Sequence, residues 1–173
     1  MDRNRLMKIP LSDLDIKRAL PNTLVKKYSE LSAYRTIHDL LPNKGDSMII
    51  ILEDRRNSGH WVAMMNLGRY FYYFNSYGGK YDTDLNIIPR AIRACLGETH
   101  QEIRRLLGKE YCEYNKKKYQ GENSEVCGRY CIVAIEMMCH MGFDPSEFLT
   151  FMNKQKNESE LSYDQVVCRL CPI

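Results

Sequence analysis

The sequence predicts an α+β fold with a central mixed β-sheet flanked by helices. Three apolar, β-favouring runs gather in the middle of the chain, at 48–52, 61–65 and 70–74. Helical patterns precede and follow them and do not alternate with them, which favours α+β over repeated βαβ units. A chain of 173 residues can bury a core of its own. We therefore expect a single domain that spans residues 1–173.

Helices are predicted in the first 42 residues. Ser12 to Asp15 has the pattern of a helix start with a capping box, and Pro21 ends that helix. Two further short helices are expected at 25–28 and 34–41, the second closed by Pro42.

The middle of the chain predicts the sheet. Residues 48–52 have the composition of a buried strand, and the aromatic runs at 61–65 and 70–74 flank Asn66-Leu-Gly-Arg69 as a hairpin would. Residues 76–79 form a loop. Helices are expected from Pro89 to about Leu96 and at 99–107, and one more strand at 111–114.

A buried helix follows, and a cysteine stands at its start. Its apolar positions have helical spacing and are Tyr130, Cys131, Ala134, Ile135, Met138 and Met141. Cys127 falls in the first turn, where the helix dipole favours a thiolate and lowers the thiol pKa. Further helices are expected after Pro145 and Ser162.

Composition excludes several classes of protein. The formal charge of +3 is too small to indicate a nucleic-acid partner by itself. The seven cysteines form no disulfide framework and the first residues lack a signal peptide, so we expect reduced thiols in an intracellular protein. The apolar runs are too short for a membrane span. Neither a membrane partner nor a cofactor is expected.

Two cysteines near the end of the sequence could belong to a metal site. Cys168 and Cys171 have the spacing of half a zinc site, but Cys139-His140 is the only other candidate pair nearby. We therefore expect no metal.

A nucleophilic cysteine needs a base, a group that orients the base, and donors for the oxyanion. Of the four histidines, His60 lies at a loop-to-strand boundary that can present a side chain to a cleft. Asn75 ends the next strand of the same hairpin, and neighbouring strands lie roughly 5 Å apart. Asn75 could thus accept the His60 ring N–H. The Gln120 side chain and the Cys127 amide could hold the oxyanion.

Together these residues form a pattern that is known from a protein family. Gly-His60-Trp61, the strand ending at Asn75, then Gln120 and Cys127-Gly128 resemble the adenovirus-type maturation proteases, which are relatives of the SUMO-deconjugating cysteine proteases. The resemblance covers about residues 47–142. Within these families the chain is most similar to the capsid-maturation proteases of virophages of the mavirus type.

The resemblance implies a papain-related core with a permuted catalytic order. It makes Cys127 the nucleophile and His60 the general base, as a thiolate–imidazolium pair, with Asn75 as the orienting group. Gln120 would hold the oxyanion, with Trp61 and Gly128 beside the site. The families usually carry Asp or Glu where this chain has Asn75. Asp54 and Asp82 are therefore open alternatives for the third position.

The resemblance also implies a function. The substrate would be a viral capsid precursor, cut by a monomer in the virion and in the viral factory of the host cytoplasm. DNA or a peptide could activate the enzyme. One alternative is an isopeptidase that removes ubiquitin-like proteins. Another is an inactive scaffold or DNA-binding module of the same fold.

Other motifs have ordinary structural explanations. Cys131 and Trp61 are expected in the core, and the aromatic run at 70–74 is expected to pack within the sheet. A basic group could bind DNA or an acidic substrate, but a solvated surface is the favoured explanation. Its members are Arg90, Arg93, Arg104, Arg105 and Lys116 to Lys118.

Overall fold

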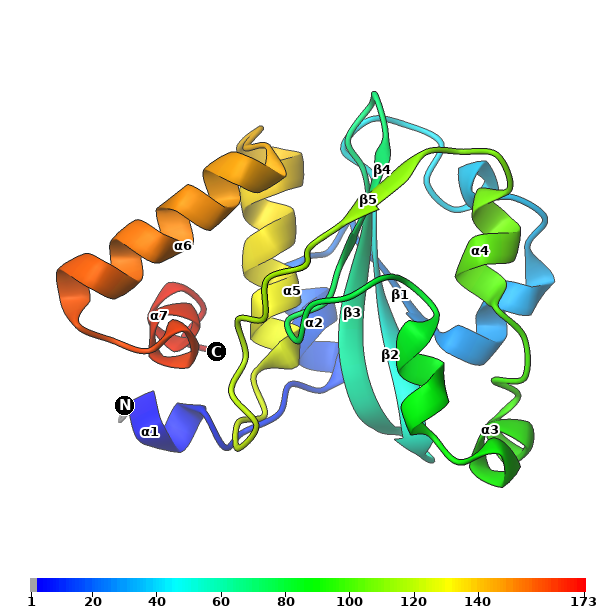
Figure 1. The fold of residues 1–173 in the computed structure, drawn as a ribbon, viewed down its shortest axis with the longest axis horizontal. Helices are drawn as coiled ribbons and strands as arrows, with labels where there is room; N and C mark the ends of the chain where they lie inside the picture. Colours follow the sequence, from blue (N-terminus) through cyan, green and yellow to red (C-terminus); the bar gives the residue numbers. More distant parts are fainter. Residues whose placement is uncertain (1–2) are drawn as a thin grey trace.

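The computed structural model describes residues 3–173 and has a five-stranded mixed sheet at its centre (Figure 1). The strand order is β1-β2-β3-β4-β5. The three central strands are antiparallel, whereas β1 is parallel to β2 and β5 is parallel to β4. The strands are β1 (Leu24–Lys27), β2 (Ser47–Arg55), β3 (Ser58–Asn66), β4 (Phe71–Phe74) and β5 (Cys112–Tyr114). The predicted α+β class with a mixed sheet is therefore confirmed.

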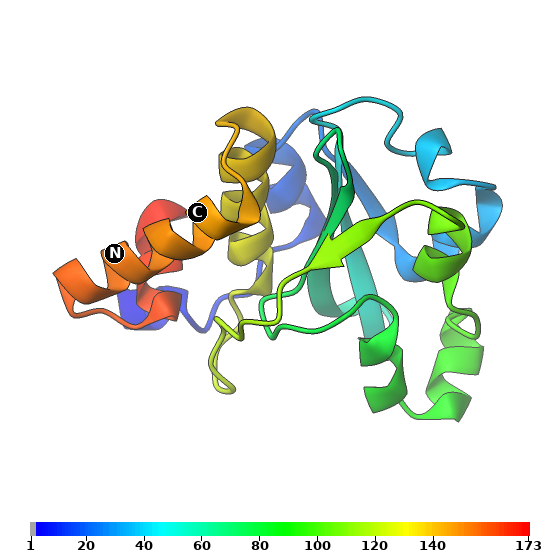
Figure 2. The same ribbon diagram turned by 45° about the horizontal axis from the view of Figure 1, so that its top comes forward.

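Helices cover both faces of the sheet. In Figure 1, α5, α6 and α7 lie to the left of it and α3 and α4 to the right. Figure 2 shows the same separation after a rotation of 45°. The helices are α1 (Arg3–Leu6), α2 (Asp13–Ala19), α3 (Arg90–Leu96), α4 (Glu102–Leu107), α5 (Cys127–Ile135), α6 (Pro145–Ser159) and α7 (Tyr163–Leu170). Short 3-10 helices occupy Tyr28–Ala33, Ile37–Asp39 and Thr83–Ile87, and a π-helical turn, Glu136–His140, extends α5.

Side-chain alternation along the strands builds two cores. Ile49, Ile51 and Ala63 face the side of α5, while Ile50, Val62 and Met64 face the side of α4. This period of two is what a sheet covered on both faces requires. All nine residues of α5 are buried, and its apolar side chains belong to the first core.

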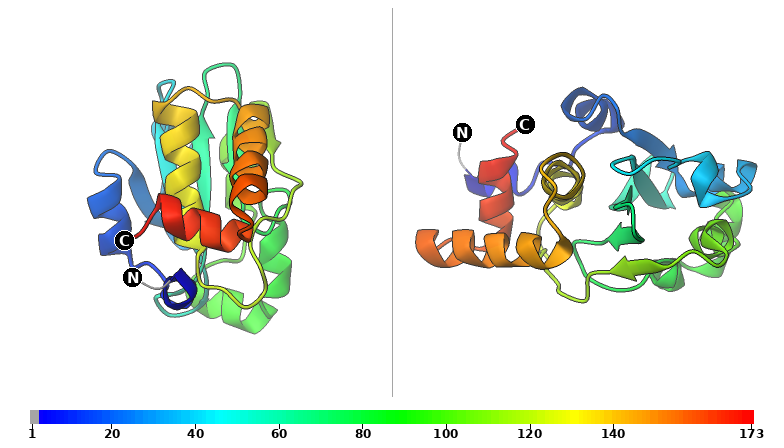
Figure 3. Two further views of the ribbon diagram at one scale, coloured as in Figure 1. Left: turned by 90° about the vertical axis from the view of Figure 1, so that its left-hand side faces the viewer. Right: turned by 90° about the horizontal axis from the view of Figure 1, so that it is seen from above.

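The position of α5 follows from this burial. It lies along one face of the sheet, with α6 and α7 on the side away from the sheet, as the right-hand view of Figure 3 shows. Cys127 is its first residue and lies at the end of the helix that faces the β2–β3 turn. The fold thus holds the thiol on a rigid support.

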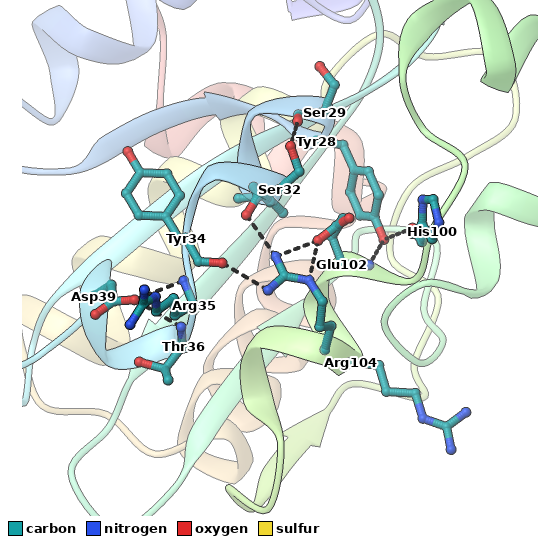
Figure 4. A network of polar contacts seen from close by, with 12 residues as sticks. Tyr28, Ser29, Ser32, Tyr34, Arg35, Thr36, Asp39, His100, Glu102 and Arg104 are labelled. Carbon is teal, nitrogen blue, oxygen red and sulfur yellow. Dashed lines mark hydrogen bonds and ion pairs between the residues drawn. The ribbon is translucent and has the colours of Figure 1, made fainter.

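Most predicted elements are present, and two predictions are wrong. Residues 25–28 were predicted as a helix but belong mainly to β1, where Val25 pairs with Ile49 of β2. Residues 34–41 contain only the short 3-10 turn Ile37–Asp39, since Asp39 accepts the N–H groups of Arg35 and Thr36 and closes a tight turn (Figure 4). Such capping contacts compete with a longer helix.

A polar network anchors the segment after β1. The Tyr28 hydroxyl donates to Asp82 at 2.5 Å and accepts from the Glu102 amide at 2.7 Å. Figure 4 shows Tyr28 between His100 and Glu102. Burial raises the pKa of Tyr28, so its hydroxyl keeps its proton. The network joins the first 3-10 helix to the start of α4.

Two expectations concern the whole chain. All seven cysteines lie in the described part and carry free thiols. Within residues 3–173, no helix has the length and apolar character needed to cross a membrane.

Candidate functional site

Cys127 Sγ meets strand β3 next to His60. The Trp61 amide donates to Cys127 Sγ over 3.5 Å. Cys127 is only 6% exposed and packs in the core shared by α5 and the sheet. The thiol therefore lies against the residue that follows His60 in the chain.

The predicted lowering of the Cys127 pKa is not found. Burial raises the pKa of the thiol, while the N–H groups of Trp61, Gly128 and Cys127 oppose that rise. Burial likewise lowers the pKa of His60, against the hydrogen bond to Asn75. Desolvation disfavours charge on both groups, so burial outweighs the helix start here. In the free protein these shifts favour a neutral thiol and a neutral imidazole over the predicted ion pair.

His60 and Asn75 are in direct contact, as predicted. His60 Nε2 lies 2.7 Å from Asn75 Oδ1. His60 is the third residue of β3, and β4 stops at Phe74, opposite Ala63. His60 thus lies beyond the end of its neighbouring strand, and its ring can reach the residue that follows β4.

The surroundings of Asn75 define which imidazole nitrogen carries the proton. Asn75 Oδ1 also accepts the Tyr77 amide at 3.0 Å, and Asn75 Nδ2 donates to a carboxylate oxygen of Asp84. An amide N–H can only donate and a carboxylate accepts, so the Asn75 side chain has one possible orientation. His60 must then donate from Nε2, which leaves the lone pair of the neutral ring on Nδ1.

Tyr77 covers the imidazole. Its ring centroid lies 4.8 Å from that of His60. Burial, and then the charge of the Cys127 thiolate, raise the pKa of Tyr77. One tyrosine therefore contacts the His60 ring and lies within electrostatic range of the Cys127 sulfur.

Gln120 is held rigidly in the loop before α5. Its Oε1 accepts the Ser76 hydroxyl at 2.6 Å, and its Nε2 donates to the Ser124 carbonyl at 2.8 Å. Within residues 3–173, no hydrogen bond uses the second hydrogen on Nε2. Gln120 is 2% exposed, so this donor has a fixed direction. The loop also joins the residue after Asn75, since the amides of Tyr119 and Gln120 both donate to the Ser76 carbonyl.

Trp61 and Gly128 pack against one another. A methyl group on Gly128 would lie 3.3 Å from Trp61 Cδ1 and 3.2 Å from Leu11 Cβ. The Trp61 indole N–H donates to the Leu11 carbonyl at 3.1 Å. Gly128 therefore permits the close approach of α5 to the indole, and Trp61 serves the core as the sequence predicted.

The N-terminal segment passes along the site. The Glu125 amide donates to the Met7 carbonyl at 2.8 Å, and Arg129 Nη1 donates to the Ile9 carbonyl at 2.6 Å. Arg129 has no exposed surface and also donates to the Ile173 carbonyl. A buried guanidinium two residues after Cys127 thus ties this segment to α5. Its position in an otherwise apolar helix was a signal that sequence reasoning missed.

A cavity of about 880 Å³ opens beside these residues. Trp61 and Gly59, the two chain neighbours of His60, line it together with Leu11 and Glu125. Its other walls include Lys26 of β1 and further charged side chains. A space of this size can take several residues of an extended peptide, and its lining reaches the chain neighbours of His60 but neither His60 nor Cys127.

The alternative acids lie elsewhere. Asp54 is exposed near the end of β2 beside Arg55, and Asp82 binds Tyr28 and the Arg104 amide. The His60 side chain, in the part of the chain that the structure describes, bonds to neither of them. Asp84 is the acid connected to the site, because it accepts a hydrogen bond from Asn75 Nδ2. Sequence reasoning missed Asp84 because it belongs to a 3-10 helix that no pattern predicted.

Across the described residues, no three His, Cys, Asp or Glu side chains are placed to hold a metal ion. Cys168 and Cys171, the predicted half-site, are buried in the same core as α5.

Comparisons with known proteins relate the chain to a virophage protein. No protein-family model matches the chain. The chain is 29% identical over 166 residues to "Uncharacterized protein V9" of Sputnik virophage, which covers 92% of this chain and 93% of that protein. This similarity links the chain to a virophage protein along nearly its whole length.

Proposed function

We propose that this chain is a cysteine endopeptidase that cleaves virion precursor proteins during particle maturation. The observation that carries the proposal is the placement of Cys127 Sγ against the Trp61 amide, next to a histidine bonded to Asn75. A thiol, a base with a defined tautomer and a rigid amide donor are the groups that acyl transfer requires. The virophage relative supports a viral setting.

The fold supports the same proposal. The nucleophile begins a buried helix, and the base and its partner lie at the ends of β3 and β4. In chain order the groups are His60, Asn75, Gln120 and Cys127. We take this to be the papain-related core in its permuted order, as the resemblance implied.

Acylation would proceed as follows. Cys127 Sγ attacks the scissile carbonyl carbon while His60 Nδ1 takes the thiol proton. The negative charge moves to the carbonyl oxygen, which Gln120 Nε2 and the Cys127 amide stabilise. His60 then gives its proton to the leaving amine, the C–N bond breaks, and a thioester remains on Cys127.

In deacylation, water replaces Cys127 as the nucleophile. Water attacks the thioester carbon, His60 Nδ1 takes the proton of the water, and the oxyanion returns to the same two donors. Collapse of the intermediate breaks the C–S bond, and the proton on His60 returns to Cys127 Sγ. The carboxylic acid product leaves, and no cofactor is consumed.

The cavity beside Trp61 is the proposed substrate site. Its lining combines apolar side chains such as Leu11 with charged side chains of both signs. An extended peptide could lie along β1 and reach Cys127 past the indole. This arrangement suits an endopeptidase, which must bind chain on both sides of the scissile bond.

Co-expression with a capsid precursor of the same virus tests the proposal. Mass spectrometry should find cleaved precursor with the wild-type chain and intact precursor with Cys127→Ala. Cys131→Ala is the matched control, because it removes a buried thiol one helical turn away. It should leave cleavage unchanged.

Three other outcomes would overturn the proposal. Cleavage of ubiquitin-like conjugates without cleavage of the precursor would identify a deconjugating isopeptidase. DNA binding without any cleavage would identify an inactive module. Cleavage that survives Cys127→Ala would exclude Cys127 as the nucleophile.

A further inference from the structure

We infer that Asp84 is a positioning residue that supplies, through Asn75, the negative charge which the site lacks next to His60. The inference rests on the proposed function, since it assigns Asp84 a part in that reaction. Asp84 comes from the 3-10 helix Thr83–Ile87, well apart in sequence from His60 and Cys127.

The contact with Asn75 is specific. Asn75 Nδ2 donates to Asp84 Oδ2, while Asn75 Oδ1 accepts from His60. The three side chains thus form a chain in which each hydrogen bond points from His60 toward the carboxylate. When His60 becomes imidazolium, its positive charge and the negative charge of Asp84 lie at opposite ends of one polarisable amide.

Asp84 has no other evident task. Within residues 3–173 it forms no ion pair, and its side chain makes one hydrogen bond, to Asn75. Asp82, two residues earlier, differs because it binds Tyr28 and the Arg104 amide. Burying a carboxylate without a counter-ion costs free energy, so the placement of Asp84 beside Asn75 favours a role at the site.

The charge of Asp84 acts in surroundings that are otherwise neutral or acidic. Burial raises the pKa of Asp84, and the hydrogen bond from Asn75 opposes that rise. Burial, and then the charges of Asp84 and Asp82, raise the pKa of Tyr73, so this buried tyrosine stays neutral. The His60 imidazolium is the cation that the hydrogen bonds through Asn75 connect to Asp84.

The arrangement also explains Asn at position 75. Asn75 Oδ1 accepts two N–H groups, a task that an aspartate could also perform. An aspartate would, however, place its second oxygen against Asp84 Oδ2, where Asn75 now donates. Two adjacent carboxylates repel, so the charge can occupy position 75 or position 84 but not both.

Variants that remove the carboxylate from position 84, or move it to position 75, test the inference. Asp84→Asn keeps an acceptor oxygen and removes the charge. Asn75→Asp in the wild-type background creates two facing carboxylates. The double variant Asn75→Asp/Asp84→Asn moves the negative charge from position 84 to position 75, whose side chain bonds directly to His60. Each variant is checked for folding by its thermal unfolding midpoint.

Two measurements are made on each variant. The pKa of His60 is read by NMR of the imidazole Cε1–H group in a Cys127→Ala background, so that the thiol does not titrate with it. For Asp84→Asn we expect this pKa to fall by roughly one pH unit. In the active background kcat should fall about tenfold, with KM unchanged. The double variant should recover both values.

The outcomes separate this inference from the proposed function. If Asp84→Asn leaves the His60 pKa unchanged, the inference is overturned whether or not the wild type cleaves a precursor. If the double variant is as impaired as Asp84→Asn, the missing negative charge does not explain the loss of activity, and the inference is overturned. If the His60 pKa falls as expected but the wild type cleaves no precursor, Asp84 still acts on His60 and the proposed function fails.

Discussion

The Trp61 amide donates to Cys127 Sγ over 3.5 Å. This contact joins the strand that carries His60 to the helix that begins with the thiol, although 66 residues separate the two partners. The amide belongs to the backbone, so its direction is set by the sheet. The sulfur is thus held at a defined place relative to His60 before any substrate arrives.

Gln120 should matter through its free N–H. Gln120→Ala removes the proposed oxyanion donor, and loss of one such donor lowers kcat roughly 100- to 1,000-fold. The KM should change little, because the charge develops only in the transition state. Steady-state kinetics on a peptide from the capsid precursor gives both values.

Ser76→Ala is the matched control for Gln120. It removes the 2.6 Å bond from the Ser76 hydroxyl to Oε1 but keeps the amide donor. The effect should be much smaller than that of Gln120→Ala. Equal losses in the two variants would mean that Gln120 only holds the loop together.

Gly59 should be intolerant of any side chain. A Cβ there would lie 1.9 Å from the Leu52 carbonyl oxygen, inside the β2–β3 pairing. Gly59→Ala must shift one strand, and overpacking of this kind costs roughly 1–3 kcal/mol of unfolding free energy. Chemical denaturation measures that loss. Ser58→Ala, one residue earlier, should stay close to the wild type.

The same variant should impair activity beyond its effect on stability. His60 follows Gly59 directly, so a displaced strand moves the imidazole away from Asn75. Cleavage assayed at a temperature where Gly59→Ala is folded should still be slow. Full activity there would show that the geometry of the β2–β3 turn is not critical.

Glu98 should make stability depend on pH. It has no exposed surface, and its Oε1 accepts the Glu53 amide at 2.7 Å. Burial, with the charges of Glu53 and Asp54, raises the pKa of Glu98 to about 7, against the hydrogen bond from Glu53 and the charge of Arg93. The folded protein therefore binds this proton more tightly than the unfolded chain does.

The sign of the effect follows from linkage. A raised pKa stabilises the fold below the ordinary value of 4.5, and that contribution is lost as pH rises to about 7. The free energy of unfolding should fall by about 1–3 kcal/mol over this pH range. Glu98→Gln should abolish this dependence in unfolding curves at pH 5 to 8, whereas Glu122→Gln, on an exposed side chain, should retain it. An unchanged dependence in Glu98→Gln would assign it to another group.

Local patterns predicted much of the fold. The Ser12 capping box, the hairpin of β3 and β4, and the buried helix from Cys127 depend on neighbouring residues, and each is present. The predicted contact of His60 with Asn75 followed from hairpin geometry and is confirmed. Such features are visible in sequence because the interactions that stabilise them are short-range.

Features set by distant partners could not be predicted. Val25 joins a strand because β2 offers it a parallel edge. Asp84 and Arg129 acquire their roles from contacts with Asn75 and with the Ile9 carbonyl. The pKa of Cys127 depends on burial by the surrounding core, which outweighs the local helix start.

Covalent labelling tests the central claim most directly. The chain is treated at neutral pH with an electrophilic peptide whose sequence is taken from the capsid precursor, and the labelled cysteine is identified by mass spectrometry. We predict that Cys127 is labelled although it is buried, and that His60→Ala abolishes this reaction. The opposite result is that the exposed Cys95 reacts first and the buried Cys127 stays unlabelled. That result would contradict a catalytic pair of Cys127 and His60.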